Sequence, residues 1–374
     1  MQILSPSAEQ PNQDLSGIAS RFEGGSASAR IRPLGNGNVN DTFLVEGSEP
    51  FVMQRLNTAV FRQPQQVMHN LLAVSRHIDH KLSDPAEPME GRRWEMPRVI
   101  KLRHSDGHWV EAEGGFWRGI SYIGAAESVD VLSSNRQALE VGYGLGRFHQ
   151  LISDLPCDQL KDTLEGFHIA PGYLANHDDV CAGLERELQG DEVLCQQFIE
   201  QRRDFIPTLE QAKASGELVL RPIHGDPKVN NLMLDADSGR AIALVDLDTV
   251  KPGLVHYDIG DCLRSGCNQL GEEATDPAAV TFDLQRCEAI LTGYLNAARP
   301  SLSEADFDYL FAAIRLIPLE LGLRFFTDHL QGNTYFKVNH PMQNLLRAQV
   351  QFNLCASIEA QELEIRSLIQ RLRS

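Results

Sequence analysis

The segment 224–248 constrains the fold of this chain more than any other part of the sequence. It begins with the letters HGDPKVNN, ends with DLD, and contains two short apolar runs separated by Asp237-Ser238-Gly239. Apolar runs joined by such a turn predict a β-hairpin. Because the two ends of a hairpin lie side by side, Asn231 and Asp246 are expected about 5 Å apart.

This hairpin would gather oxygen-bearing side chains at one point. Asp226 lies on the loop that enters the hairpin, five residues before Asn231. With Asp246, two carboxylates and one carboxamide oxygen then converge on a small volume. Hard oxygen ligands of this kind suit Mg²⁺, which takes its other ligands from water and phosphates. Phosphoryl transfer needs such parts, and Lys228 could reach the transferring phosphoryl group.

Two other residues of the segment leave alternatives open. Asp248 faces the same side as Asp246 if the chain there is extended, so it either helps to hold metal or substrate or caps the following turn. His224 is expected to pack and to donate or accept hydrogen bonds, without a part in catalysis.

Length and charge narrow the classes of protein. A chain of 374 residues is long for one core, so two domains, or two lobes around a cleft, are expected. The formal net charge of −17 repels polyphosphate backbones and anionic membranes, which argues against nucleic-acid and membrane partners. The most apolar stretch, Tyr309 to Phe326, is interrupted by charged residues and a proline and predicts a buried helix pair. We find no signal peptide and no CxxC pair, so a cytoplasmic location with reduced thiols is predicted.

The pattern along the chain predicts an α+β fold with two lobes. Residues 1–28 are expected to form a loose leader, 29–123 a small β-rich N-lobe, and 124–374 a larger, mainly helical C-lobe. Within the N-lobe, Thr42–Val45 and Phe51–Leu56 are expected to be strands. This outline is that of a two-lobed kinase.

At these residues the sequence resembles the aminoglycoside phosphotransferase and choline kinase superfamily, in which HGDxxxxN stands in place of the catalytic loop of protein kinases. The resemblance is greatest to the N-acetylhexosamine 1-kinases. It covers both lobes, through Gly35–Val45, Phe51–Asn57, Trp117–Ile123, His224–Asn231, Val245–Gly253, His256–Arg264 and Glu320–Lys337.

The resemblance implies roles for individual residues of the C-lobe. Asp226 would contact the acceptor hydroxyl, and Asn231 and Asp246 would bind Mg²⁺. Arg324 and Tyr335 would contact the sugar, and Asp258 would brace the catalytic loop.

In the N-lobe the resemblance implies ATP-binding residues, with two departures. Ser121, Tyr122 and Ile123 would form the hinge that faces adenine. The strand that usually carries a phosphate-pairing Lys has Gln54 and Arg55 instead. The loop Gly35-Asn36-Gly37-Asn38 lacks a third glycine, yet between two strands it could present backbone N–H groups to phosphate.

Arg324 lies in an otherwise apolar helix, and a buried Arg needs a partner. Either it pairs with Glu320 or Asp328 or, as the resemblance implies, it binds a sugar.

The sequence thus predicts an ATP- and Mg²⁺-dependent kinase of carbohydrate metabolism that phosphorylates the anomeric hydroxyl of an N-acetylhexosamine. Two alternatives remain: a kinase of the same fold that acts on an amino alcohol, homoserine or an aminoglycoside, and a non-catalytic nucleotide-binding pseudokinase, suggested by the missing Lys. Which hexosamine is the acceptor, whether ATP or GTP is used, and the oligomeric state are left open.

Overall fold

A computed structural model of the chain describes residues 14–35, 39–84 and 91–373. The chain divides into two compact units. The smaller, here the N-unit, comprises Met1–Met68 and Pro97–Ile123, and the larger, here the C-unit, comprises His69–Met96 and Gly124–Ser374. The segment 69–96, assigned to the N-lobe from the sequence, therefore belongs to the larger unit.

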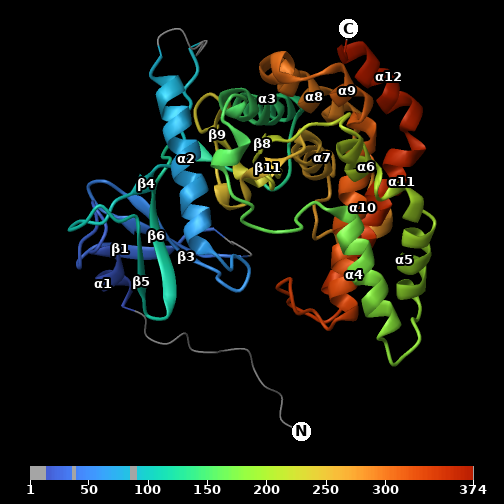
Figure 1. Ribbon diagram of the computed structural model, residues 1–374, viewed down its shortest axis with the longest axis horizontal. Helices are drawn as coiled ribbons and strands as arrows, with labels where there is room; N and C mark the ends of the chain where they lie inside the picture. Colours follow the sequence, from blue (N-terminus) through green and yellow to red (C-terminus); the bar gives the residue numbers. More distant parts are fainter. Residues whose placement is uncertain (1–13, 36–38, 85–90, 374) are drawn as a thin grey trace. The chain divides into compact units, whose positions relative to one another are not determined.

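The N-unit is built on an antiparallel sheet with the strand order β1-β2-β3-β6-β4, and β5 also pairs with β6 (Figure 1). The strands are β1 (Arg30–Pro33), β2 (Asp41–Glu46), β3 (Phe51–Leu56), β4 (Val99–Ile100), β5 (Trp109–Ala112) and β6 (Gly115–Ser121). β3 begins with the three buried apolar residues Phe51, Val52 and Met53 and ends with buried Leu56, so most of this strand faces the core of the N-unit.

Residues 14–28 are not a loose leader. The short helix α1 (Leu15–Ala19) and the residues after it bury Ile18 and Phe22 against Phe51 and Trp117 of the sheet. The stretch is rich in Ser and Gly, which favours a loose chain, but a few apolar side chains suffice to attach it to the sheet. The first thirteen residues lie outside the described part.

The C-unit is mainly helical. Its helices are α2 (Pro64–Leu82, which begins in the N-unit), α3 (Asn135–Ile152), α4 (Ala170–Ala182), α5 (Asp191–Glu200), α6 (Thr208–Ser215), α7 (Val255–Gly266), α8 (Leu284–Ala298), α9 (Glu304–Asp308), α10 (Leu310–Leu330), α11 (Gln343–Ala360) and α12 (Glu362–Arg373). Short 3₁₀ turns are η1 (Cys157–Gln159), η2 (Arg203–Phe205), η3 (Val229–Asn231), η4 (Leu247–Thr249), η5 (Pro277–Ala279) and η6 (Arg299–Ser301).

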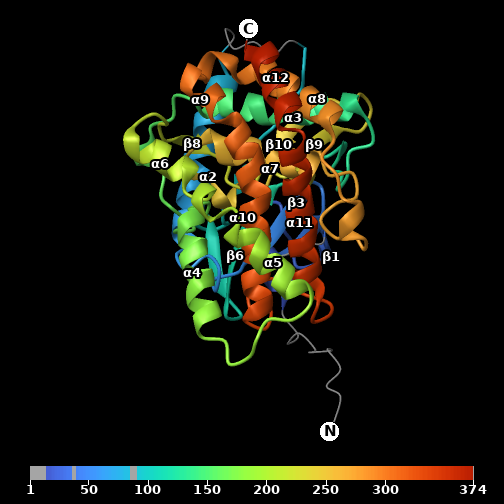
Figure 2. The same ribbon diagram turned by 90° about the vertical axis from the view of Figure 1, so that its right-hand side faces the viewer.

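The longest helix of the C-unit is α10, which packs along α11 (Figure 2). The predicted helix pair at 309–326 is wrong, because α10 continues through Pro318 as one helix. Among the described residues no helix is long and apolar enough to span a bilayer.

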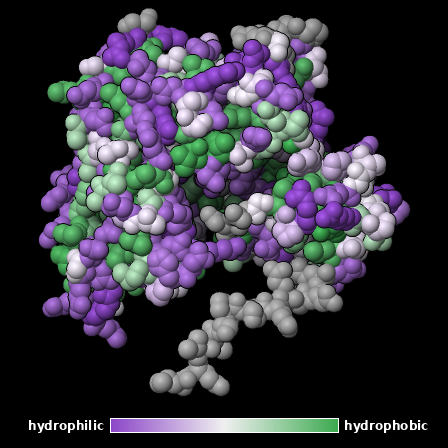
Figure 3. Space-filling view, turned by 180° about the vertical axis from the view of Figure 1, so that it is seen from behind, coloured by the Kyte–Doolittle hydropathy of each residue, from purple (hydrophilic) through white to green (hydrophobic). Residues whose placement is uncertain are grey.

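Hydrophilic and hydrophobic side chains are intermixed over the face shown in Figure 3.

The hairpin predicted at 232–245 is present as β9 (Leu232–Asp235) and β10 (Ala241–Leu244). Leu232 is paired with Leu244, and the Val245 N–H donates to the Asn231 carbonyl at 2.9 Å. β7 (Ala126–Glu127) adds a third strand beside β9, and β8 (Arg221–Ile223) pairs with β11 (Lys251–Gly253). The segment 224–231 therefore runs from β8 to β9, with both ends anchored.

Candidate active site

The loop 224–231 is held from below by one carboxylate of α7. Asp258 is fully buried and accepts hydrogen bonds from the backbone N–H groups of His224 at 2.7 Å and Gly225 at 2.8 Å. It also contacts the Nε2 of His149, on α3, at 2.8 Å. Burial by itself would raise the pKa of Asp258, but these hydrogen bonds outweigh it and lower that pKa. Asp258 is thus a charged support for the loop.

His224 is a structural member of the loop. Its ring Nε2 donates to the Val245 carbonyl at 2.9 Å, and its Nδ1 accepts from the Asp226 N–H at 3.2 Å. Its own carbonyl accepts from the Thr249 hydroxyl at 2.9 Å. Burial lowers the pKa of His224, in keeping with a neutral ring that donates from one nitrogen and accepts at the other.

Gly225 is required by the path of the chain. Its φ is +89°, and a Cβ at this position would lie 2.6 Å from the Thr249 carbonyl oxygen. A side chain here would push the loop away from the 247–249 turn, so the sequence HGD reflects local geometry as well as chemistry.

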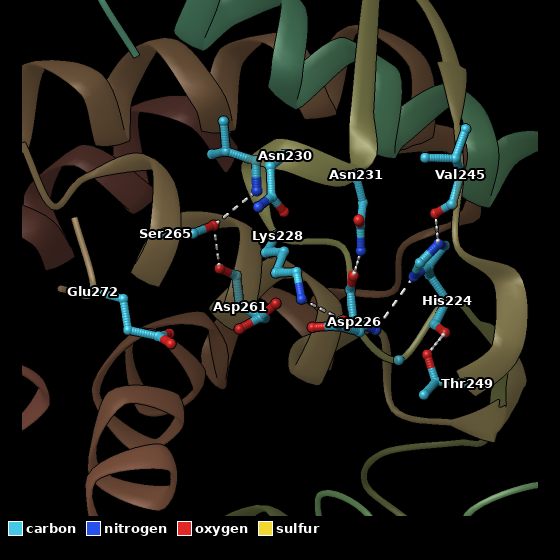
Figure 4. Close-up of polar contacts among 12 residues, drawn as sticks. His224, Asp226, Lys228, Asn230, Asn231, Val245, Thr249, Asp261, Ser265 and Glu272 are labelled. Atoms are coloured by element: carbon cyan, nitrogen blue, oxygen red, sulfur yellow. Dashed lines mark hydrogen bonds and ion pairs between the residues drawn. The ribbon is translucent and has the colours of Figure 1, made fainter. Parts of the chain in front are cut away.

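Three predicted residues lie together beyond Gly225 (Figure 4). The Lys228 ammonium donates to a carboxylate oxygen of Asp226 at 3.0 Å, and the Asn231 amide nitrogen donates to the Asp226 carbonyl at 2.7 Å. The Asp226 carboxylate raises the pKa of Lys228, so the ammonium stays charged. Since the Asn231 nitrogen is used within the loop, its carboxamide oxygen is the atom left to face a cation.

Asp246 follows β10 and adopts a left-handed conformation, with φ at +64°. A non-glycine residue in this region costs on the order of 1–3 kcal/mol and often marks a functional site. The hydrogen bond from Val245 to Asn231 places the two predicted metal ligands on neighbouring strand ends. A carboxylate and a carboxamide oxygen are suitable donors for Mg²⁺.

The environment of Asp248 differs from the one assumed above. Residues 247–249 form the 3₁₀ turn η4, so the chain after Asp246 is not extended and the two side chains do not follow strand alternation. Asp248 is 3% exposed, and its carbonyl accepts from the Thr163 hydroxyl at 2.7 Å.

The side chains of the two residues predicted to replace the missing Lys lie on different faces of the N-unit sheet. Gln54 and Arg55 are neighbours on β3, so their side chains point to opposite faces of the sheet. Gln54 is paired in register with Arg118 of β6, and its carboxamide oxygen accepts two hydrogen bonds from that guanidinium, at 3.0 and 2.7 Å. Arg118 could not be predicted from the sequence as a partner of Gln54, because only strand pairing brings the two residues together.

The other positions predicted to bind the nucleotide are partly described. Gly35 has φ at +70°, whereas Asn36, Gly37 and Asn38 lie outside the described residues. Ser121 closes β6, where its N–H donates to the Arg98 carbonyl at 2.7 Å. Tyr122 is exposed and Ile123 is buried.

A cavity of about 220 Å³ in the C-unit contains the predicted sugar-contacting residues. Its lining comes from the 160–169 loop, α4, α10 and the segment after α10: Leu164, Glu165, Tyr173, Asn176, Arg324, Thr327, Asp328, Gln331, Tyr335 and Phe336. Arg324 and Tyr335 therefore lie in one site.

Four aromatic rings surround the Arg324 guanidinium. Their centroids lie 4.9 to 5.9 Å from its central carbon and belong to Tyr173, Phe167, Phe336 and Tyr335. Within the described ranges no ion pair or hydrogen bond engages Arg324. Of its two expected internal partners, Glu320 contacts His168 through one carboxylate oxygen, and Asp328 accepts backbone N–H groups at 334–336 and the Asn344 amide. Neither carboxylate forms an ion pair or hydrogen bond with Arg324, so the predicted internal ion pair is absent.

These features define the class of protein. A small antiparallel N-unit, a helical C-unit and a braced HGD loop leading into a hairpin form a protein-kinase-like fold. The model of the phosphotransferase enzyme family matches residues 30–291, more than half of the chain. The chain belongs to this family.

Solved structures with the same fold are distant in sequence. An aminoglycoside phosphotransferase from Alicyclobacillus acidocaldarius is 14% identical, with a TM-score of 0.64 and coverage of 98% of this chain and 99% of that one. A microcompartment-associated aminopropanol kinase is 16% identical, with a TM-score of 0.62 and coverage of 94% and 98%. A Plasmodium vivax ethanolamine kinase is 12% identical, with a TM-score of 0.55 and coverage of 91% and 84%. At these identities the likeness shows the fold alone.

Proposed function

We propose that this phosphotransferase is an ATP-dependent kinase that phosphorylates the anomeric hydroxyl of an N-acetylhexosamine, GlcNAc or GalNAc, and thereby serves carbohydrate metabolism. The observation that carries the acceptor class is Arg324, a charged side chain that lines a cavity and has no hydrogen-bond or ion-pair partner among the described residues. A guanidinium enclosed in this way needs oxygen acceptors, which a sugar ring and an acetamido carbonyl supply.

Arg324 also bears on acceptors that carry positive charge. Aminopropanol and ethanolamine kinases appear among the structural neighbours, and an amine group would be repelled by this guanidinium at close range. The aromatic rings that could form a cage for an ammonium group are already occupied by Arg324 itself. This favours a neutral, oxygen-rich acceptor.

The catalytic loop supplies the chemistry of transfer. Asp226 would orient the anomeric hydroxyl and receive its proton late, because the transition state of phosphoryl transfer is loose. Lys228, already held by Asp226, would offset charge on the transferring group. Asn231 and Asp246 would hold Mg²⁺, which neutralises charge on the nucleotide phosphates when bound.

A second candidate, a kinase of an amino alcohol or aminoglycoside, rests on Glu165. This exposed carboxylate also lines the cavity, and it could pair with an amine at some distance from Arg324. The pseudokinase alternative finds less support, since Asp226, Lys228 and Asn231 are joined by hydrogen bonds in one loop.

The test is an ADP-release assay with ATP and Mg²⁺ across GlcNAc, GalNAc, glucose, galactose, choline, ethanolamine, homoserine and kanamycin. We expect turnover of an N-acetylhexosamine, and no turnover of choline or kanamycin. Phosphorus NMR of the product then identifies the position, because an anomeric phosphate couples to H1 and a 6-phosphate couples to two methylene protons. A 6-phosphate would refute the anomeric assignment, and turnover of an amine-bearing alcohol alone would establish the second candidate.

A further inference from the structure

His168 lies between the catalytic loop and α10, and the proposed reaction does not yet use it. The residue is 4% exposed and has φ at +65°. Its Nε2 lies 2.7 Å from the Gly225 carbonyl oxygen, and its Nδ1 lies 3.0 Å from a carboxylate oxygen of Glu320. The imidazole is stacked on the Tyr257 ring, at 5.1 Å and 15°. A buried non-glycine residue in a left-handed conformation is held there by its contacts.

The direction of the hydrogen bond to Gly225 follows from its partner. A carbonyl oxygen only accepts, so the Nε2 must donate to Gly225, and the Nδ1 is the ring atom that contacts Glu320. Burial opposes a charged ring, yet Glu320, and to a smaller extent the Gly225 carbonyl and Asp261 of α7, raise the pKa of His168. One residue thus donates to the catalytic loop and contacts α10 at the same time.

The two partners of His168 belong to different parts of the site. Gly225 directly precedes Asp226, whereas Glu320 lies one helical turn before Arg324 on α10. The loop that carries His168 also contributes Leu164 and Glu165 to the cavity. His168 is thus the residue at which two walls of the cavity and the catalytic loop are joined.

We propose that His168 is a positioning residue that sets Asp226 relative to the acceptor cavity by donating to the Gly225 carbonyl while Glu320 holds it to α10. The assignment of the acceptor to this cavity rests on the proposed function. The link that His168 makes between α10 and the catalytic loop does not depend on the proposed function, because it is argued from the contacts of His168.

A matched pair of substitutions separates the two bonds. The amide nitrogen of a Gln can take the place of Nε2 and keep the donation to Gly225, whereas that of an Asn reaches only the place of Nδ1 and can contact only Glu320. Asn also tolerates a left-handed backbone better than Gln, so backbone strain would disfavour the variant that we expect to be active. Both substitutions are made alone and with Glu320→Gln, which prevents an unpaired buried charge from unfolding the protein.

For His168→Asn we expect kcat to fall by roughly 10- to 100-fold, because displacement of a catalytic group by about 1 Å costs on that order. The KM for ATP should stay unchanged. His168→Gln should recover most of kcat, and it should raise the KM for the acceptor through loss of the link to α10. Wild-type kcat in His168→Asn/Glu320→Gln, or equal kcat in the Asn and Gln variants, would overturn the proposal.

Amide hydrogen exchange of the segment 221–231 gives a readout that does not depend on the acceptor. Exchange should be faster in His168→Asn than in the wild type, and close to the wild type in His168→Gln. If the wild type phosphorylates an alcohol other than a hexosamine, or none in the panel, the proposed function fails while this comparison still decides the role of His168. Equal exchange in all three proteins would refute the positioning role of His168.

Discussion

Replacement of Gly225 by Ala tests whether the path of the catalytic loop matters as much as its charges. Ala at φ of +89° costs about 1–2 kcal/mol in backbone conformation. Its Cβ would also lie 2.6 Å from the Thr249 carbonyl oxygen, so the loop must shift by about 0.8 Å to reach ordinary van der Waals contact. Crowding of this kind costs about 1–3 kcal/mol more.

Gly239 provides the matched control. It lies at the turn of the β9–β10 hairpin with φ at +69°, and no atom lies within 4 Å of the position of its Cβ. Gly239→Ala therefore carries the same backbone cost without the collision. We expect it to lower the free energy of unfolding by about 1–2 kcal/mol and to leave kcat unchanged.

Chemical denaturation and steady-state kinetics of the two variants measure both effects. Gly225→Ala should lose about 2–5 kcal/mol of stability, and kcat should fall by roughly 10²-fold, because Asp226 moves with the loop. The reasoning fails if Gly225→Ala, folded at the assay temperature, retains the kcat of Gly239→Ala.

Four other outcomes are expected. Asp226→Asn should lower kcat by at least ~10²–10⁴ with little change in ATP affinity, as measured by nucleotide titration; an unchanged kcat would remove Asp226 from the reaction. Activity should vanish in EDTA and return with Mg²⁺ or Mn²⁺, and Asp246→Ala should be folded but inactive; full turnover in excess chelator contradicts the metal assignment. Arg324→Ala should raise the KM for the sugar more than the KM for ATP, and equal changes would place Arg324 outside the acceptor site. Asp258→Asn should destabilise the protein at neutral pH, and denaturation curves of the two proteins should converge as the pH falls below about 4, because a lowered carboxyl pKa stabilises the fold only while the group is charged.

Much of the site could be predicted from the sequence because it is local. The turn at 237–239 and the apolar runs beside it determine the β9–β10 hairpin without help from the rest of the chain. Asn231 and Asp246 are then identified as the ends of the hairpin, and Gly225 of the HGD motif marks the turn that precedes it. The α+β division into a β-rich and a helical part could also be predicted, since a periodicity of two or of 3.6 residues is a property of short segments.

Other features depended on contacts between distant segments. Pairing of β3 with β6 brings Arg118 to Gln54, and no local pattern states which strands will pair or in which register. The attachment of residues 14–28 to the sheet and the single helix α10 were mispredicted for the same reason: composition and a proline were weighed without the core that outweighs them.

The sequence by itself determined that this chain carries a phosphotransferase loop and hairpin, because those residues are neighbours in the chain. Only the tertiary structure decided that Arg324 has aromatic neighbours and no internal ion pair, and that His168 joins α10 to Gly225. Whether a buried charge is neutralised within the protein or left for a ligand depends on side chains as far as 152 residues apart along the chain, and folding alone brings them within hydrogen-bonding distance.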